Sequence, residues 1–470
     1  MGGASPPGST DPVKKPAETK DGTTPLAPGQ TPGITGANAG SATPAAAAAA
    51  AAGKGASIKI DPPDNTPKAT DGNPLFSITA DPKMPAINAK ASVVGITTGA
   101  DPTATTEFVW TATVTYDSKS TLSGVSSGAC TFKGAPKKGD TRKIDAIKKE
   151  GKVTGGAIVV NFDKIRGGDL LISLTATVGG QVIKGETKGW RIQGTNPALA
   201  DVNKELPDDA MRRLTCLESQ KKQFVASSGE GNAMYPQFSG DGCLGVGICQ
   251  LTNPQPTDDQ IWDWKENVKA GVVLYNEKRN VAKGYPAKVA ASANFLKLVK
   301  DYNDNLSKAP APAAGAAPAA GGAPAAAAAG GAAPGPGPAP GGAPAGGAAP
   351  APGGPPAPAA SAPSAPKVTV KVPEFTEDQL QDDTIRGFNG WAGDDGFTVG
   401  PNGKPWLHEF RIKQDPKTKA LVVEGDPKSG TVNAAWETVP WSDRPVTGDQ
   451  KYVDDVKSYD PNTCVATKKK

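Results

Sequence analysis

The sequence predicts a multidomain α+β protein, in which an all-β part is followed by a mainly helical part. Three observations support this prediction. Alternating and β-branched apolar runs recur over residues 57–197. Apolar residues at spacings of three and four recur over residues 208–305. A stretch of Ala, Pro and Gly without any charge, broken only by two serines, occupies residues 309–366 and predicts a disordered linker.

The composition indicates that part of the chain does not pack. The 470 residues include 57 Gly and 46 Pro, and 37% are apolar, against a usual share of about 45–50%. Residues 1–56 should form a disordered arm, because they cannot bury enough apolar surface to offset their ordering entropy. The formal charge of +4 suits an anionic polymer such as a cell wall, and nothing indicates a nucleic-acid partner.

No apolar run reaches the roughly 20 residues of a membrane span. The N-terminus also lacks the charged start and apolar core of a secretory signal. We therefore expect neither a membrane span nor a Sec-type signal.

Residues 57–197 predict an antiparallel, Ig-like β-sandwich. Their apolar runs are separated by clusters of Gly, Pro, Asp and Asn, a spacing typical of sandwiches. Trp110 and Phe162 are the expected core aromatics. No acidic cluster or His occurs here, so we expect an accessory or spacer domain. A wall-binding or partner-binding module is the alternative.

Residues 198–308 predict a helical region whose candidate catalytic residue is Glu218. Asp208 is the expected N-cap of the first long helix. Met211, Leu214 and Leu217 mark its apolar stripe, and Glu218 borders that stripe. A carboxyl group at the edge of a buried face should have a raised pKa, because burial disfavours its charged form, and a general acid needs such a shift. An ordinary surface glutamate is the alternative.

The cysteines and the single histidine argue against a metal site. One His (His408) and five cysteines without a CxxC pair do not supply a Cys/His zinc site, so we expect no metal and no cofactor. Cys216, Cys243 and Cys249 lie around the Glu218 stretch and are expected as buried thiols. A Cys216–Cys243 disulfide is the alternative in an oxidising compartment.

Around Glu218 the chain resembles the soluble lytic transglycosylase (SLT) family, which has a lysozyme-like fold. Glu218-Ser219 matches the family's helical Glu-Ser pair. Residues 247–251 match its Gly-Leu-Met-Gln turn, with Cys249 in place of Met, and residues 267–271 match its Asn-(Ile/Val)-x-x-Gly helix. The resemblance covers residues 205–306 and 376–412.

The family's later Tyr-Asn-x-Gly turn has two candidates in this sequence. Tyr302-Asn303 falls within a predicted helix, whereas Phe388-Asn389-Gly390 joins a helix end to a glycine turn and is preferred. With that choice, residues 309–366 are an insertion in one lysozyme-like domain whose second part is 367–470. Lengthening a loop adds little closure entropy, and residues 367–470 hold only short elements, which suit an independent core poorly.

The resemblance implies a lytic transglycosylase that cuts the β-1,4 bond between N-acetylmuramic acid and N-acetylglucosamine in peptidoglycan. Glu218 would protonate the leaving oxygen and then act as base on the muramyl 6-hydroxyl, giving a 1,6-anhydro product. The residues implied to bind or orient the sugar are Ser219, Gln250, Asn267, Tyr275, Phe388 and Asn389.

Two alternatives stay open. If Asp241 or Glu230 acts as a second carboxylate, water attacks and the enzyme is a hydrolytic lysozyme-type muramidase. If no chemistry occurs, the protein is a structural or delivery protein with a lysozyme-like binding domain. The implied partner is the glycan strand, in the periplasm or outside the cell. Without a Sec signal, a secretion machine or a phage-like particle would have to deliver the protein.

Overall fold

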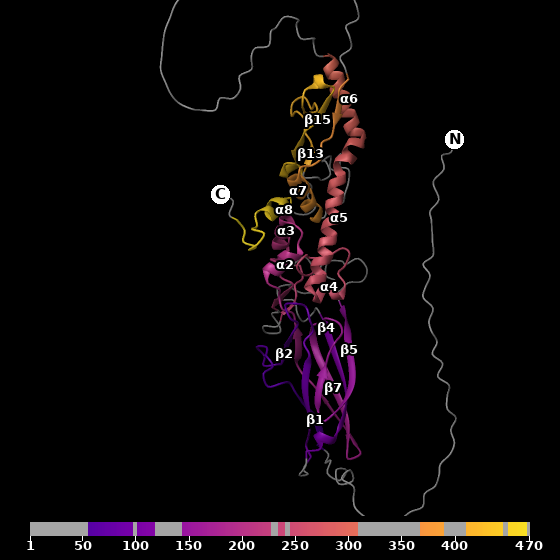
Figure 1. The fold of residues 1–470 in the computed structure, drawn as a ribbon, viewed down its shortest axis with the longest axis vertical. Coiled ribbons are helices and arrows are strands. Elements are labelled where there is room, and N and C mark those ends of the chain that lie inside the picture. The colour runs from indigo at the N-terminus through magenta and orange to yellow at the C-terminus, as the bar shows by residue number, and fades with distance from the viewer. Residues whose placement is uncertain are drawn as a thin grey trace, which may run out of the picture.

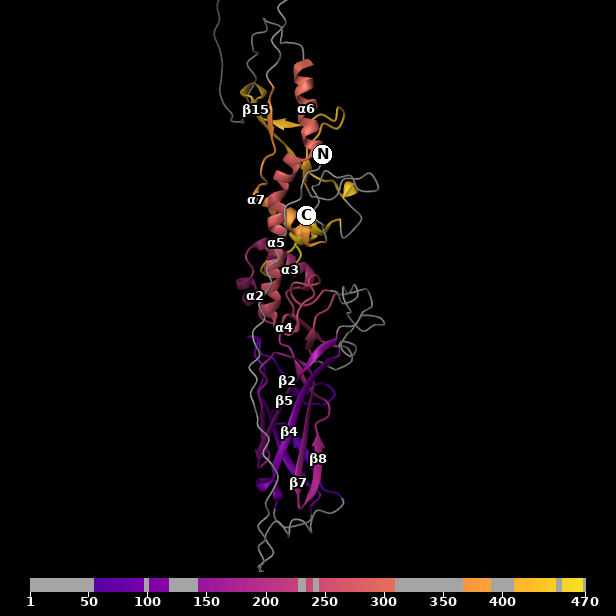
Figure 2. The same cartoon turned by 90° about the vertical axis from the view of Figure 1, so that its right-hand side faces the viewer.

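The computed structural model describes residues 55–96, 101–117, 143–226, 234–239, 245–308, 367–389, 410–444 and 450–467. The chain is mixed α+β and elongated, with a large β unit at one end, helices in the middle and small sheets at the other end (Figure 1). The same order holds after a quarter turn (Figure 2). Residues 1–54 of the predicted arm and the predicted linker 309–366 lie outside the described ranges.

Two sheets form the large β unit, and their inner faces share one core. The order is β1-β3-β6 in the smaller sheet and β2-β9-β7-β4-β5 in the larger, with β8 on β7. The bounds are β1 (Ser57–Asp61), β2 (Leu75–Ser77), β3 (Ile87–Val94), β4 (Glu107–Asp117), β5 (Lys143–Thr154), β6 (Ala157–Val160), β7 (Gly168–Val178), β8 (Gln181–Glu186) and β9 (Trp190–Gln193), with a 3-10 turn at Pro102–Thr105. Trp110 and Phe162 belong to this core, which confirms their prediction as core aromatics.

The β core continues into the helical part through Trp262. The Tyr116 ring of β4 meets the Trp262 ring edge-on, with centroids 5.1 Å apart. A β carbon at Gly167 would lie 2.2 Å from the Trp262 ring, so only glycine permits this approach. Arg166, 4% exposed, pairs with Asp258 at 3.3 Å and Asp259 at 3.1 Å. The β unit is therefore packed firmly on the helices.

The helical part is built from segments on both sides of residues 309–366. The helices are α2 (Leu199–Glu205), α3 (Asp209–Ser219), α4 (Asp258–Trp262), α5 (Trp264–Ala291), α6 (Ala293–Lys308), α7 (Glu377–Phe388) and α8 (Tyr452–Lys457). Strand β10 (Phe224–Ala226) pairs antiparallel with β11 (Met234–Pro236). One buried cluster unites Leu214 and Trp264 with Ile385 and Val453. The chain after residue 366 thus completes a core begun before residue 309.

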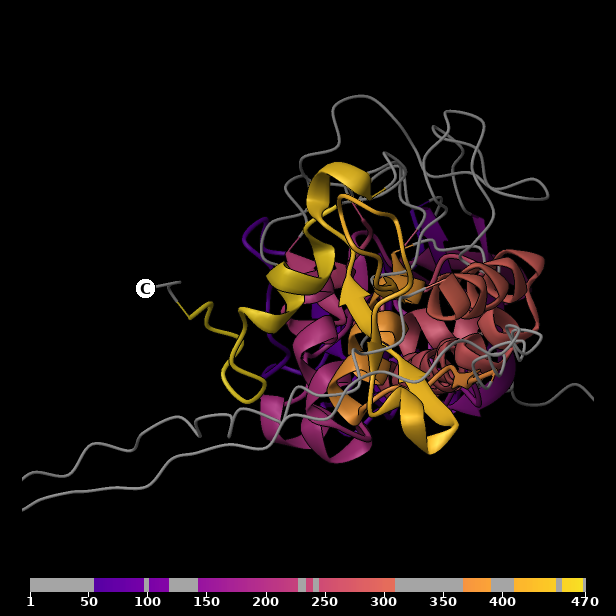
Figure 3. The ribbon, with the colours of Figure 1, turned by 90° about the horizontal axis from the view of Figure 1, so that it is seen from above.

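Small sheets cover the far ends of α5 and α6. They comprise β12 (Thr369–Lys371), β13 (Phe410–Ile412), β14 (Val423–Glu424), β15 (Thr431–Ala434) and β16 (Trp436–Thr438), with 3-10 turns at Pro427–Ser429 and Trp441–Asp443. Tyr285 and Phe295 of the two helices share a core with Val370, Ile412 and Val432. Viewed along the long axis, the two helices lie beside these strands (Figure 3). No helix in the described ranges combines the length and apolar character needed to cross a membrane.

Candidate active site

Glu218 lies in the last turn of α3. Asp208 caps the start of this helix by accepting the Met211 N–H at 2.8 Å, as predicted. The helix ends at Gln220, which has a left-handed backbone with φ of 52°. Its buried side is formed by Ala210, Met211, Leu214, Thr215, Cys216 and Ser219. Glu218 is half-buried beside this face, in agreement with its predicted position at the border of the stripe.

A cleft of about 470 Å³ opens at the Glu218 side chain. Its lining comes from the end of α3, the turn after β11, one side of α5 and the end of α7. The lining residues are Glu218, Ser239, Gly245, Cys249, Gln250, Thr252, Asn253, Leu274, Lys278, Gly387 and Phe388. Glu218, Gln250 and Phe388, predicted separately, therefore share one cavity. Glu218 is the only carboxylate in this described lining.

Tyr452 of α8 is a partner of Glu218 that the sequence prediction missed. Its hydroxyl donates a hydrogen bond to Oε1 of Glu218. Tyr452 is 7% exposed and packs in the same core as Leu214, so its ring is fixed. The local signal for this residue is weak, because α8 has only six residues. A tyrosine followed by Val453 and Val456 indicates one apolar helix face and nothing about a carboxylate 234 positions away.

Cys249 lies between Glu218 and α5. Its thiol is fully buried, and burial together with the nearby Glu218 charge raises the pKa of Cys249 to about 12. Cys249 touches α5 at Gly271, where an added β carbon would lie 2.3 Å from Sγ. The thiol therefore stays protonated at neutral pH and serves as a packing group instead of a nucleophile.

Buried polar side chains hold the turn that carries Gln250. Oδ1 of Asn267 accepts the Cys249 N–H at 3.0 Å, and Nδ2 of Asn267 donates to the Val246 carbonyl at 3.0 Å. Oε1 of Gln223 accepts the Ile248 N–H at 3.1 Å. A β carbon at Gly247, with φ of 73°, would lie 2.4 Å from this same Oε1. The side-chain amides of Asn267 and Gln223 therefore fix the turn that carries Gln250.

Ser219, Asn267 and Tyr275 do not contact the cleft, which corrects their prediction as substrate-binding residues. Ser219 is 4% exposed, and Asn267 and Tyr275 are 0% exposed. Ser219 donates to the carbonyl of Ile248 at 2.7 Å. The Tyr275 hydroxyl donates to Asp208 at 3.0 Å, and burial together with the Asp208 charge raises the pKa of Tyr275. All three residues position backbone or other side chains beneath the site.

Gln250 and Phe388 do reach the cleft. Gln250 is half-buried with φ of 46°, and its Nε2 donates to the Gly247 carbonyl at 2.8 Å. Phe388 ends α7 and packs 6.1 Å from the ring of Tyr275. Asn389 caps α7 through its N–H to the Arg386 carbonyl at 3.1 Å and is not part of the described lining. Gly390, Asp241, Glu230 and His408 lie outside the described ranges.

The state of Cys216 differs from both predictions. Cys216 is bonded to Cys464, so Cys216 is neither a free thiol nor a partner of Cys243. Cys243 lies outside the described ranges, and Cys249 is the buried thiol that was expected. No local pattern indicated a bond between residues 248 positions apart.

Within the described residues, no three His, Cys, Asp or Glu side chains gather as a metal site would require. Comparison with protein-family models, with curated proteins and with solved structures gave no match.

Proposed function

We propose that the protein is a peptidoglycan-cleaving lytic transglycosylase with Glu218 as general acid and base. The observation that carries the proposal is the cleft in which Glu218, Gln250 and Phe388 converge while Tyr452 holds one carboxyl oxygen. Glu218, Gln250 and Phe388 come from three of the four motifs that resemble the SLT family. They meet in one cleft although the sequence separates them by up to 170 positions.

The reaction uses Glu218 first as an acid and then as a base. Glu218 protonates the glycosidic oxygen between N-acetylmuramic acid and N-acetylglucosamine, while the Tyr452 hydroxyl, which donates to Oε1, fixes the orientation of the carboxyl group. The resulting carboxylate then takes the proton of the muramyl 6-hydroxyl as that oxygen attacks the anomeric carbon. The product is a 1,6-anhydromuramyl end. Gln250 offers an amide to the sugar, and Phe388 offers an apolar wall.

This route needs one carboxylate, whereas inverting hydrolysis needs two. Glu218, the carboxylate of the described lining, supplies what internal attack requires. The lysozyme-type muramidase is the second outcome that product analysis would detect.

The remaining parts follow from this proposal. The helical part with the 309–366 insertion is a lysozyme-like catalytic domain, and the two-sheet unit is an Ig-like accessory sandwich that positions it. Glycan strands are the partner, in the periplasm or outside the cell. A secretion machine or phage-like particle delivers the protein there, and recovery of the protein only from the cytosol of intact cells would contradict this.

The test is digestion of purified murein followed by mass spectrometry of the released muropeptides. We expect 1,6-anhydro ends from the wild type, and a loss of about 10²–10⁴-fold in Glu218→Gln, which keeps the shape and removes the acid. Glu277→Gln, an exposed change on α5, is the control and should keep full activity. Reducing ends would indicate the muramidase. Equal release by wild type and Glu218→Gln would remove Glu218 as the general acid. No release by the wild type would leave a non-catalytic binding protein.

A further inference from the structure

The contact between Tyr452 and Glu218 joins two segments that are remote in sequence. Glu218 belongs to α3, whereas Tyr452 belongs to α8, which follows residues 309–366. On its own, α8 has three buried side chains (Tyr452, Val453 and Val456) and two ion pairs, from Lys457 to Asp382 at 2.7 Å and from Asp454 to Arg444 at 3.8 Å. So short a helix has little intrinsic stability. The position of α8 beside α3 therefore depends on the contacts that hold the residues following α8.

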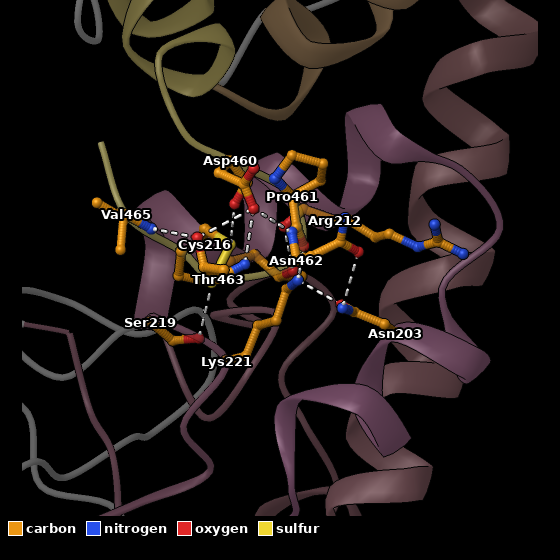
Figure 4. The surroundings of a disulfide bond; sticks show 12 residues. Asn203, Arg212, Cys216, Ser219, Lys221, Asp460, Pro461, Asn462, Thr463 and Val465 are labelled. Atoms are coloured by element: carbon orange, nitrogen blue, oxygen red, sulfur yellow. Dashed lines mark hydrogen bonds between the residues drawn. A yellow bond between two sulfur atoms is a disulfide. The ribbon is translucent and has the colours of Figure 1, made fainter. Parts of the chain in front are cut away.

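The turn after α8 is fastened to α3 by a covalent bond. Cys216 lies two residues before Glu218 and forms a disulfide with Cys464, with Cα atoms 5.0 Å apart. The buried ammonium group of Lys221 adds hydrogen bonds to the Pro461 carbonyl and to Oδ1 of Asn203 (Figure 4). The end of α3 therefore holds the C-terminal segment at two neighbouring points.

The fastened turn is linked firmly to α8. The Asp460 carboxylate accepts the N–H groups of Asn462 at 2.9 Å and Thr463 at 2.8 Å. The Thr467 N–H donates to the Ser458 carbonyl at 2.7 Å and closes the turn. Because these bonds make residues 458–467 one ordered unit, restraint at Cys464 is passed directly to the end of α8.

The two sulfur atoms differ in their access to solvent. Cys216 is 0% exposed, whereas Cys464 is half-buried between the exposed residues Thr463 and Val465. A thiolate reductant can therefore reach the bond from the Cys464 side. A dithiol such as dithiothreitol gives two electrons and two protons to the bond, leaves Cys216 and Cys464 as thiols and itself becomes a cyclic disulfide.

We propose that the Cys216–Cys464 disulfide makes the activity of the Glu218 site depend on redox state, by holding Tyr452 on Glu218. In the oxidised protein the turn is bonded to α3 and the Tyr452 contact is formed. In the reduced protein the turn keeps its hydrogen bonds, among them Lys221 to Pro461 and Asn203 to Asn462, but loses its covalent bond to α3. Helix α8 then leaves α3 more often, and Glu218 loses the hydrogen bond from Tyr452. The enzyme is then poorly active in a reducing cytosol and reaches full activity in an oxidising compartment. This inference rests on the proposed function.

The test compares murein release by four proteins: wild type, Cys464→Ser, Tyr452→Phe and the double variant. Because partial contacts of α8 persist, we expect Cys464→Ser to lower the rate by roughly three- to tenfold. Cys464→Ser should lower the rate only slightly in the Tyr452→Phe background, since the hydrogen bond that the disulfide supports is already absent. Dithiothreitol should lower the rate of wild type and leave Cys464→Ser unchanged. Val465→Ser, an exposed change in the same turn, is the matched control.

A second measurement separates this inference from the proposed function. Hydrogen exchange of the amides in residues 452–467 is compared in oxidised and reduced wild type, with bond cleavage verified by mass spectrometry. Faster exchange after reduction supports the restraint even if murein is not the substrate, and unchanged exchange overturns it. An equal loss from Cys464→Ser in both backgrounds would overturn the route through Tyr452.

Discussion

The hydroxyl of Ser219 donates to the carbonyl of Ile248 at 2.7 Å and so ties the residue after Glu218 to the turn that carries Gln250. Two short motifs that were predicted separately are joined by this one bond. The serine of the Glu-Ser pair is thus explained by the backbone it holds, without any contact to a ligand.

Ser219→Ala should lower both stability and activity. The change leaves a buried carbonyl without this donor, which costs about 1–3 kcal/mol in the free energy of unfolding. Urea denaturation measures that loss. Ser307→Ala removes an equivalent hydroxyl from an exposed site on α6 and should change stability by less than about 0.5 kcal/mol. Equal effects of the two substitutions would contradict the role given to Ser219.

Alanine substitutions at two glycines of α5 should change the stability of the fold in opposite directions. A β carbon at Gly271 would lie 2.3 Å from Sγ of Cys249, whereas a β carbon at Gly284 would meet no other atom within 4 Å. Gly271→Ala should therefore destabilise the fold by about 1–3 kcal/mol. Gly284→Ala should stabilise it by up to ~1 kcal/mol, through helix propensity.

Thermal denaturation of the two glycine variants gives the comparison. Cys249→Gly should restore part of the stability lost in Gly271→Ala, because it removes the atoms that the new methyl group meets. No rescue would mean that Cys249 is not the group that requires a glycine at this position.

Lys221 should make stability rise with pH in the alkaline range. Its side chain is 1% exposed, and burial, followed by the charge of Arg212, lowers the pKa of Lys221 to about 8, while Asp460 and Asp209 act in the opposite direction. Between that pKa and the unfolded value of about 10.4, the unfolded chain binds more protons than the folded chain. Linkage then makes the free energy of unfolding increase with pH across this window.

The measurement for Lys221 is the difference in unfolding free energy between wild type and Lys221→Met at pH 7, 8.5 and 9.5. The unfolding free energy of wild type should increase relative to that of Lys221→Met as the pH rises. Lys222→Met, an exposed neighbour, should show no such trend. A wild-type gain on acidification would show that the charged form of Lys221 is favoured in the folded protein.

Lys278 should favour glycans that carry carboxylates. This half-buried lysine lines the cleft and makes no ion pair with any residue in the described part of the chain. Lys278→Met should raise KM for murein by up to about fivefold, the equivalent of ~1 kcal/mol for a partly exposed ion pair. Neutral N-acetylglucosamine oligomers should bind the two proteins equally. Lys283→Met, exposed on the same helix, serves as control, and an equal change for both substrates would exclude charge recognition.

Local patterns in the sequence predicted what local physics decides. The Asp208 cap and the border position of Glu218 depend on residues within one helix, and both were found where expected. The mixed α+β character also followed from apolar periodicity. The sequence of strand β5, KIDAIKKEGKVT, is rich in lysine and lacks the β-branched apolar runs from which strands were predicted. Charges of this kind are common on strands at a sheet edge, where β5 lies.

Contacts between remote segments could not be predicted from such patterns. Tyr452 meets Glu218, and Cys464 meets Cys216, only after the whole helical part has assembled. The burial of Asn267 and Tyr275 has the same origin. A motif match identifies a residue type at a spacing, and it does not distinguish a residue that faces the cleft from one that supports it.

Helix α5 has one further consequence. It runs for 28 residues, or about 42 Å at the usual rise per residue. Its first residue, Trp264, donates to the Ala80 carbonyl of the β unit at 2.6 Å, and Tyr285 near its other end lies in the core of the small sheets. Leu274 and Lys278, between these anchors, line the cleft. These two anchors fix the distance between the cleft and the β unit. If the β unit binds a surface, only glycan strands that lie at this distance from the β unit would reach Glu218.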